Sequence, residues 1–458
     1  MSAFVLLALE AISLVAFAVL GRSMGDAALA VMVIPFVAVL LLAVSTADRL
    51  LLLLFAGVLP LSALELVPQW PLRLVVYIGV LGLLVFFRAT RAAVGEPPSC
   101  GRMEWFESAP LAVLVLWIVI SALNAYLRGW WSPFIAYYST FALLVFVLVW
   151  LSATVPSSLD DVRRVLFMMC ASYLVVPLVL PFFVTGVPTN TLGKTLTTPY
   201  SIVSLNVLGS HMATFAAVAL GLNSRRQSAL RRLALALLVI SLVAVLVFTK
   251  SRGAWLGFGA AVVFLAWRKR SVWMMVLIAL AVVALLSVNL LRVSVLSRLE
   301  ATSAQDPSLW GRILLWKYAL DIFRTNWLLG VGWENFRYVK HLFGYPLHSS
   351  FGTGFDTNSL YFEFLVDLGL VGFGAFVWLL FGTLARLVRS SSRTDVQNGD
   401  VPTALAAGIV AFGVHGMLDC VIWQHGAFML LGLLLGLAIA TRRLLLRVPS
   451  GVAQRKDA

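Results

Sequence analysis

A short polar segment, Thr249-Lys250-Ser251-Arg252-Gly253-Ala254-Trp255, joins two long apolar runs. Charged groups are costly in a bilayer, so cations at its edge are candidates for function. The planar guanidinium of Arg252 suits phosphate oxygens, and Gly253 lets the backbone approach such a ligand closely. Lys250 is then a neighbouring substrate-binding residue. The alternative is a plain loop in which Arg252 and Trp255 anchor the membrane interface.

A second basic pair, Arg312 and Lys317, lies in a helix-like stretch from Trp310 to Phe323. Arg312 is a candidate catalytic cation, with Lys317 as a binding residue. Two arginines on one side of the membrane would suit a diphosphate, which carries several negative charges. A solvated face of a surface helix is the alternative.

Polar residues also crowd the start of a late apolar run that begins near Leu360. Carboxylates there are costly unless they face water or partners. They could form a wall that orients or deprotonates an acceptor hydroxyl. Asp and Asn before a helix are also ordinary N-caps. The candidate catalytic residues are Asp356 and Asn358, and the candidate binding residues are Ser359, Tyr361 and Glu363.

The remaining polar signals are weaker. His348 is a candidate base, although a plain surface histidine fits it as well. His211, His415 and His425 form no evident ligand cluster, and Asp419, at the end of a span, is expected to pair with a cation. We find no nucleotide loop, zinc spacing or nucleophile elbow. No metal site and no cofactor are therefore expected.

Membrane helices must position these residues. Of the 458 residues, 61% are apolar and 12% are charged, whereas soluble domains have about a quarter charged. This excludes a disordered chain and argues against a soluble one. A span needs about 20 apolar residues, and the runs do not alternate as barrel strands do. We expect an all-α integral membrane protein with about 12–14 transmembrane helices. The candidate segments are 4–20, 27–46, 50–67, 72–87, 109–125, 134–151, 165–184, 207–221, 233–248, 255–267, 273–290, 360–382, 403–418 and 427–440.

The net charge of +14 is mainly a signal of topology. Lys and Arg gather on one set of loops, for example 163–164 and 268–270, and in the tail from 442. By the positive-inside rule that side is cytoplasmic. Both termini are then cytoplasmic, and contact with anionic lipids accompanies the basic loops. Nucleic acid is not expected as a partner.

The chain divides into three parts. Residues 1–290 form an N-terminal bundle of about 11 spans, and 291–357 form an external loop domain with a surface helix. Residues 358–458 hold the last spans and a basic tail. The positions Leu314, Tyr318, Asp321 and Ile322 give no clean apolar stripe, which places the 310–323 helix on or near the membrane surface. The glycines that follow it, Gly330, Gly332 and Gly344 among them, predict turns.

A second external loop, 185–206, contains Asn206, a candidate binding residue.

Three stretches together resemble the O-antigen ligase and polymerase superfamily of bacterial membrane glycosyltransferases. Segment 250–255 resembles the family's Ser-Arg-Gly segment. Gly311-Arg312 to Trp316, followed by 326–332, resembles its Gly-Arg…Trp…Asn-Pro-x-x-Gly-x-Gly run, with Trp327 in place of the proline. Segment 204–206 resembles an Asn-containing segment more weakly. The resemblance covers roughly 200–375.

One departure concerns the base. The family's ligases carry a histidine at a fixed distance before Gly-x-x-Gly, and counting back from Gly369 places Asn358 there. An amide is no general base near neutral pH. Either this chain needs no such base, or Asp356, His348 or Glu363 takes the role. The missing histidine favours a polymerase over a ligase.

The resemblance implies a GT-C-like membrane fold with one large external loop between late helices. It implies an inner-membrane enzyme of polysaccharide or lipopolysaccharide biosynthesis, with its active site facing the periplasm. The donor would be an undecaprenyl-diphosphate-linked oligosaccharide, held by Arg252 and Arg312 without a metal. The acceptor would be the next lipid-linked repeat in a polymerase, or lipid A core or another acceptor in a ligase. A chain-length regulator is a further candidate partner.

Two other functions compete with this one. A lipid-linked glycan flippase or transporter is disfavoured because the polar residues gather at one membrane face and no internal repeat is found. A peptidoglycan-type polymerase of the shape-and-division group is disfavoured by the Gly-Arg…Trp run.

Overall fold

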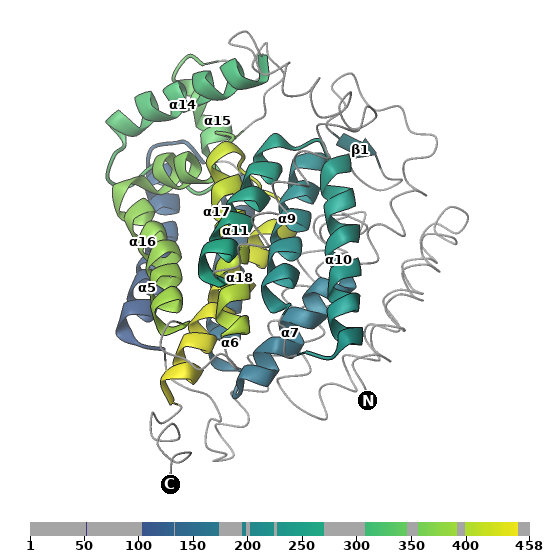
Figure 1. Cartoon of the computed structure of the whole chain (residues 1–458). Helices are drawn as coiled ribbons and strands as arrows, with labels where there is room; N and C mark the ends of the chain where they lie inside the picture. The colour runs from purple at the N-terminus through teal and green to yellow at the C-terminus, as the bar shows by residue number, and fades with distance from the viewer. Residues whose placement is uncertain are drawn as a thin grey trace, which may run out of the picture.

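The computed structural model describes residue 52 and residues 103–131, 133–173, 195–197, 202–223, 227–269, 307–345, 356–391 and 399–447 (Figure 1). These residues form a helical bundle, with one short antiparallel strand pair in which Leu196 is opposite Val203. The elements are α5 (Trp105–Leu127), α6 (Pro133–Thr154), α7 (Leu159–Ser172), β1 (Thr195–Thr197), β2 (Ile202–Ser204), α9 (Leu205–Leu222), α10 (Ala229–Phe248), α11 (Arg252–Lys269), α14 (Pro307–Thr325), α15 (Phe336–Leu342), α16 (Leu360–Ser391), α17 (Asp400–Leu418) and α18 (His425–Arg447).

The predicted all-α integral membrane fold is confirmed. Within the described ranges, seven helices are long and apolar enough to cross a membrane, namely α5, α6, α9, α10, α16, α17 and α18. The total of 12–14 spans stays a prediction, because the segments 4–20, 27–46, 72–87 and 273–290, nearly all of 50–67 and the second half of 165–184 lie outside these ranges.

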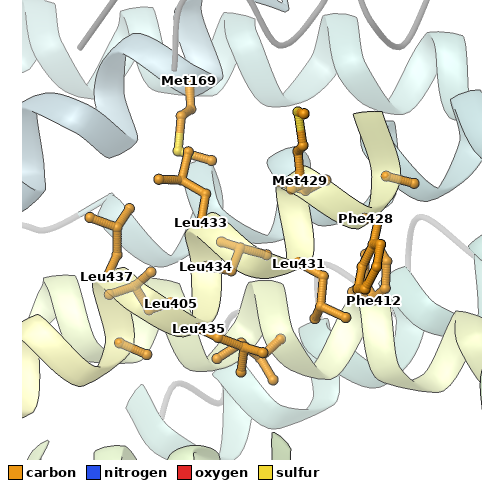
Figure 2. Packing of buried hydrophobic residues seen from close by; sticks show 14 of the residues in the cluster. Met169, Leu405, Phe412, Phe428, Met429, Leu431, Leu433, Leu434, Leu435 and Leu437 are labelled. Atoms are coloured by element: carbon orange, nitrogen blue, oxygen red, sulfur yellow. The ribbon is translucent and has the colours of Figure 1, made fainter. Parts of the chain in front are cut away.

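The core of the bundle is built around α17 and α18, whose residues are almost all buried. Figure 2 shows Leu431, Leu433 and Leu434 of α18 in one cluster with Met169 of α7 and Leu405 of α17. Small residues bring the helices together, as is usual where packing rather than hydrophobic exclusion must hold membrane helices. A Cβ atom at Gly436 would lie 2.5 Å from Val149 O, and one at Gly221 would lie 2.4 Å from Ala404 Cα.

Contacts between these helices show which of their ends meet. The start of α11 at Gly253 packs against His415 near the end of α17, and Gly416 packs against Leu360 at the start of α16. The starts of α9 and α11 also meet, because a Cβ at Gly209 would lie 3.0 Å from Ser251 Cβ. One end of the bundle therefore carries the predicted functional segments.

Basic side chains close the opposite end. Lys269 Nζ donates to Gly221 O at 2.9 Å and Asn223 O at 2.7 Å. Arg443 donates to Ala153 O at 2.7 Å, and Arg442 pairs with Glu107 at 2.7 Å. This separation of the two ends is what the positive-inside interpretation requires. The sidedness itself stays a prediction.

Helix α16 is interrupted at Gly369, where φ is +65° and ψ is −170°. The segment at Gly330 docks on this break. Val331 N donates to Val366 O at 3.1 Å, and Leu370 N donates to Trp327 O at 2.7 Å. The loop thus forms hydrogen bonds with backbone groups of α16 that lack their helical partners at the break.

The same break receives two further hydrogen bonds. Gly332 N and the hydroxyl of Ser121 on α5 both donate to Asp367 O, at 3.0 and 2.7 Å. The backbone groups that a broken helix would leave unsatisfied in a bilayer are therefore paired.

The predicted helix from Trp310 to Phe323 is confirmed as α14, which lies across one end of the bundle (Figure 1). The buried apolar residues of α14 are Leu315, Ala319 and Ile322, which face the bundle with Val366 of α16. Of the positions tested for a stripe, Ile322 belongs to this face, whereas Leu314 and Tyr318 are only partly buried.

Two expectations about loops need correction. The glycine-rich stretch after α14 contains a short helix, α15, although Gly330, Gly332 and Gly344 do have the positive φ typical of turns. Asn206, expected in a loop, lies in the first turn of α9. Helix α15 has only seven residues, and Asn206 is the second residue of α9. At such positions tertiary contacts outweigh local composition.

The docking at Gly330 predicts a specific sensitivity. Gly330→Ala should destabilise the protein strongly, because its φ is +73° and the new Cβ would lie 2.2 Å from Asp367 O. Gly129→Ala is the matched control, because Gly129 has φ +71° and no atom within 4 Å. It should cost only the backbone strain, about 1–2 kcal/mol. Thermal unfolding in detergent measures both, and equal shifts of Tm would contradict the docking role.

Candidate active site at one end of the bundle

Arg312 of α14 lies beside the connection between α17 and α18. Its Nη2 atom is 3.8 Å from Asp419 Oδ2, with side chains 18% and 10% exposed. This fits the expectation that Asp419 pairs with a cation, although 3.8 Å is longer than a hydrogen bond. The positive charge of Arg312 also acts on Asp356 and on His415. Arg312 therefore links three parts of the chain.

The Arg252 segment lies against α17. Arg252 is the first residue of α11 and is partly buried. The next residue, Gly253, faces the ring of His415, since a Cβ there would lie 2.8 Å from His415 Cδ2. The Arg252 segment, through Gly253, and Arg312, which is 60 positions away from Arg252 in the sequence, thus both come near His415.

Asp356 and Asn358 form a tight turn ahead of α16. Asn358 N donates to Asp356 Oδ1 at 2.7 Å, and Thr357 Oγ1 donates to Ser359 O at 2.8 Å. The side chain of Asp356 is buried. Burial raises its pKa above the ordinary value, while the charges of Arg337, Lys340 and Arg312 oppose the rise. A carboxylate with a raised pKa is a better proton acceptor near neutral pH.

Glu363 lies in a second cluster of acidic side chains and is completely buried. Its Oε2 atom accepts from Thr357 N at 2.8 Å. Side-chain ligand atoms of Glu363, Glu334 and Cys420 lie within 4.8 Å of one another, and all three residues are buried. Glu334 pairs with Arg337. Burial raises the pKa of Glu334; Arg337 opposes that rise and Asp356 adds to it.

Asp367 has a structural role. Its carboxylate accepts from Glu334 N at 2.6 Å and from Phe336 N at 3.0 Å, which caps the start of α15. Together with the hydrogen bonds at Val366 and Gly369, this cap fixes α15 and its charged residues above α16.

Three non-glycine residues of the described chain have positive φ, and all three lie in these loops. They are Lys250 at +52°, Glu334 at +56° and Asn358 at +50°. Asn tolerates this conformation, whereas Lys and Glu rarely adopt it. Such strain gathers at functional sites and needs surrounding structure to hold it.

Several predicted residues do not join this group. Lys317 is exposed on α14, and Lys250 is exposed in its turn. The hydroxyl of Tyr361 donates to Gly413 O at 3.1 Å, so it helps to hold α16 against α17. Asn206 is partly buried at the start of α9. His348 lies outside the described residues.

Two sets of residues escaped the sequence interpretation. Glu334 and Lys340 are buried charged residues and Arg337 is partly buried; Arg337 and Lys340 lie on α15, and Glu334 lies just before it. His415 belongs to no histidine cluster in the sequence, yet the charge of Arg312 acts on it. No local signal in the sequence links His415 to Arg252 or Arg312, which are far from it along the chain.

Residues 235–377 match the family described as O-Antigen ligase. The match covers about a third of the chain, from α10 to the middle of α16, and contains Arg252, Arg312 and Asp356. It confirms the predicted resemblance to the O-antigen ligase and polymerase superfamily. It supports an enzyme of that general type, acting in a membrane on lipid-linked glycan and acceptor substrates. No curated protein matches this chain.

Proposed function

We propose that the protein is a bacterial inner-membrane glycosyltransferase that polymerises undecaprenyl-diphosphate-linked oligosaccharide repeats, for O-antigen or exopolysaccharide, on the outer face of the membrane. One observation carries the proposal. Arg312 acts electrostatically on both Asp356 and His415, and the ring of His415 lies against Gly253. The two arginine segments and the acidic turn therefore meet at one end of the bundle.

The two arginines bind the donor diphosphate. As the bond between the anomeric carbon and the phosphate oxygen breaks, its electron pair passes to the undecaprenyl diphosphate. Arg252 and Arg312 stabilise the charge that builds there, which is the role of fixed cations in such transition states. The lipid tail stays among the helices, and no step needs a metal.

Asp356 is the proton acceptor in place of the family's histidine. The acceptor hydroxyl oxygen attacks the anomeric carbon, and its proton passes to the Asp356 carboxylate. Asp356 suits this better than Glu363, because the charge of Arg312 acts on Asp356, whereas Glu363 is completely buried beside Glu334 and Cys420. Asn358 and Ser359 then orient the acceptor from the same turn.

A ligase is the second candidate, because the matched family is described as O-Antigen ligase. A ligase would move the glycan to lipid A core or another acceptor. The asparagine at position 358 favours the polymerase, since the family's ligases have the histidine there.

Arg252 and Arg312 are tested with purified protein and a lipid-diphosphate-linked repeat unit, read as a ladder of products on a gel. Arg252→Ala and Arg312→Ala should each lower the rate by about 100-fold or more. The Lys variants should retain part of it, because they keep the charge but lose the planar fork.

Arg324→Ala is the matched control on α14, because Arg324 is exposed and pairs only locally with Asp321. It should form the wild-type ladder. A normal ladder from Arg312→Ala would contradict the assignment. A single transfer that needs added lipid A core would identify a ligase, and lipid-linked glycan flipping without transfer would identify a transporter.

Asp356→Asn should lower turnover and raise stability at once. The pKa of Asp356 is raised in the folded protein, so folding is favoured at low pH and loses stability as pH rises through the folded pKa. The neutral Asn avoids this loss. At pH 7–8 the variant should therefore melt above the wild type, and the difference should vanish near the ordinary pKa of Asp, about 4. Turnover should fall by about 100-fold without the base.

Asp160→Asn is the control, because Asp160 is an exposed partner of Arg163 on α7. It should change neither Tm nor turnover appreciably. A variant Asp356→Asn with normal turnover would remove Asp356 as the base. A larger loss of turnover in Glu363→Gln would transfer the role to Glu363.

A further inference from the structure

We infer that His415 is a third contact for the donor diphosphate, beside Arg252 and Arg312. This rests on the proposed function and adds to it a residue of α17, outside the matched segment.

His415 is completely buried, yet neither of its ring nitrogens has a hydrogen-bond partner within the described part of the chain. Buried polar atoms are nearly always hydrogen-bonded, because leaving one unpaired is costly. A neutral imidazole has one N–H donor and one lone pair. A ring in this state has a donor ready for an anionic ligand.

The ring is held against the Arg252 turn. A Cβ at Gly253 would lie 2.8 Å from His415 Cδ2 and 3.3 Å from its Nε2 atom. One turn further along α11, a Cβ at Gly257 would lie 3.2 Å from His415 Cβ. The two glycines leave space that the imidazole fills, so Nε2 lies beside the residue that follows Arg252.

Arg312 of α14 is a cation near the same ring. Its charge acts on His415, and its partner Asp419 follows His415 by one helical turn, with Asp419 N donating to His415 O at 3.1 Å. The ion pair is loose at 3.8 Å, and Arg312 Nε has no hydrogen-bond partner among the described residues. A phosphate oxygen that replaced Asp419 as the partner of Arg312 would come to the end of α17 that holds His415.

His211 completes this environment from α9. Its Nδ1 atom is 2.8 Å from Val207 O, which can only accept, so Nδ1 carries a proton. His211 lies within electrostatic range of His415. Residues of α9, α11 and α14 thus lie near one imidazole of α17. Its N–H would donate a hydrogen bond to a non-bridging oxygen of the diphosphate.

The test measures binding of undecaprenyl diphosphate to the purified full-length protein in detergent. His415→Leu, which keeps the volume but has no donor, should weaken binding by about tenfold or more, the effect of losing a hydrogen bond to a charged group. His415→Gln keeps an N–H donor and should weaken it less. His341→Gln on α15 is the control and should bind as the wild type does. Wild-type affinity in His415→Leu would overturn the inference. If its Tm also fell, His415 would have a role in packing but not in binding the diphosphate.

The arginine variants separate this inference from the proposed function. If Arg252→Ala and Arg312→Ala bind undecaprenyl diphosphate normally, the proposed diphosphate site fails. If they bind weakly while His415→Leu binds normally, only the role of His415 fails.

A second measurement covers the case in which His415→Leu does not fold. The chain has five histidines, so wild-type protein labelled with ¹⁵N-histidine gives few ring signals. The His415 signal, identified by its loss in His415→Gln, should move with undecaprenyl diphosphate and not with undecaprenol. An unmoved signal would overturn the inference.

Discussion

The break in α16 at Gly369 is the constraint on which this architecture depends. In a bilayer every backbone N–H and C=O must find a partner within the protein. The loop at Gly330 supplies these partners by pairing with Val366 and Asp367, and only a glycine can stand so close to the Asp367 carbonyl. The same turn directs the Asp367 carboxylate onto the start of α15. The loop is thereby fixed to the bundle in one register.

This fixed loop brings opposite charges together at one end of the bundle. Arg312 lies between Asp356, ahead of α16, and Asp419, after α17. Burial raises the pKa of Asp356 and of Glu334 even with cations nearby. The arrangement has the two properties that a transfer from a lipid diphosphate needs, which are cations for the leaving group and a carboxylate inclined to take a proton. Glu334 and Asn358 adopt a strained backbone conformation with positive φ in this arrangement.

The sequence was sufficient to predict the membrane fold, because hydropathy and helix length are local properties, and α14 was found at nearly its full length. It also predicted that Arg252, Arg312 and the turn at Asp356 would lie on one side of the membrane. It could not predict α15, whose seven residues are stabilised by the distant Asp367. Nor could it find His415, which joins the site only because Gly253 and Arg312 meet it in space. Tyr361, expected to bind substrate, instead donates to Gly413.

A structure of the protein with undecaprenyl diphosphate bound, determined by electron cryomicroscopy, would show directly where the diphosphate lies. We expect the two phosphates between Arg252 and Arg312, with the Arg312 guanidinium moved from Asp419 to a phosphate oxygen. Phosphates bound instead at the opposite end, beside Lys269 and Arg443, would contradict it.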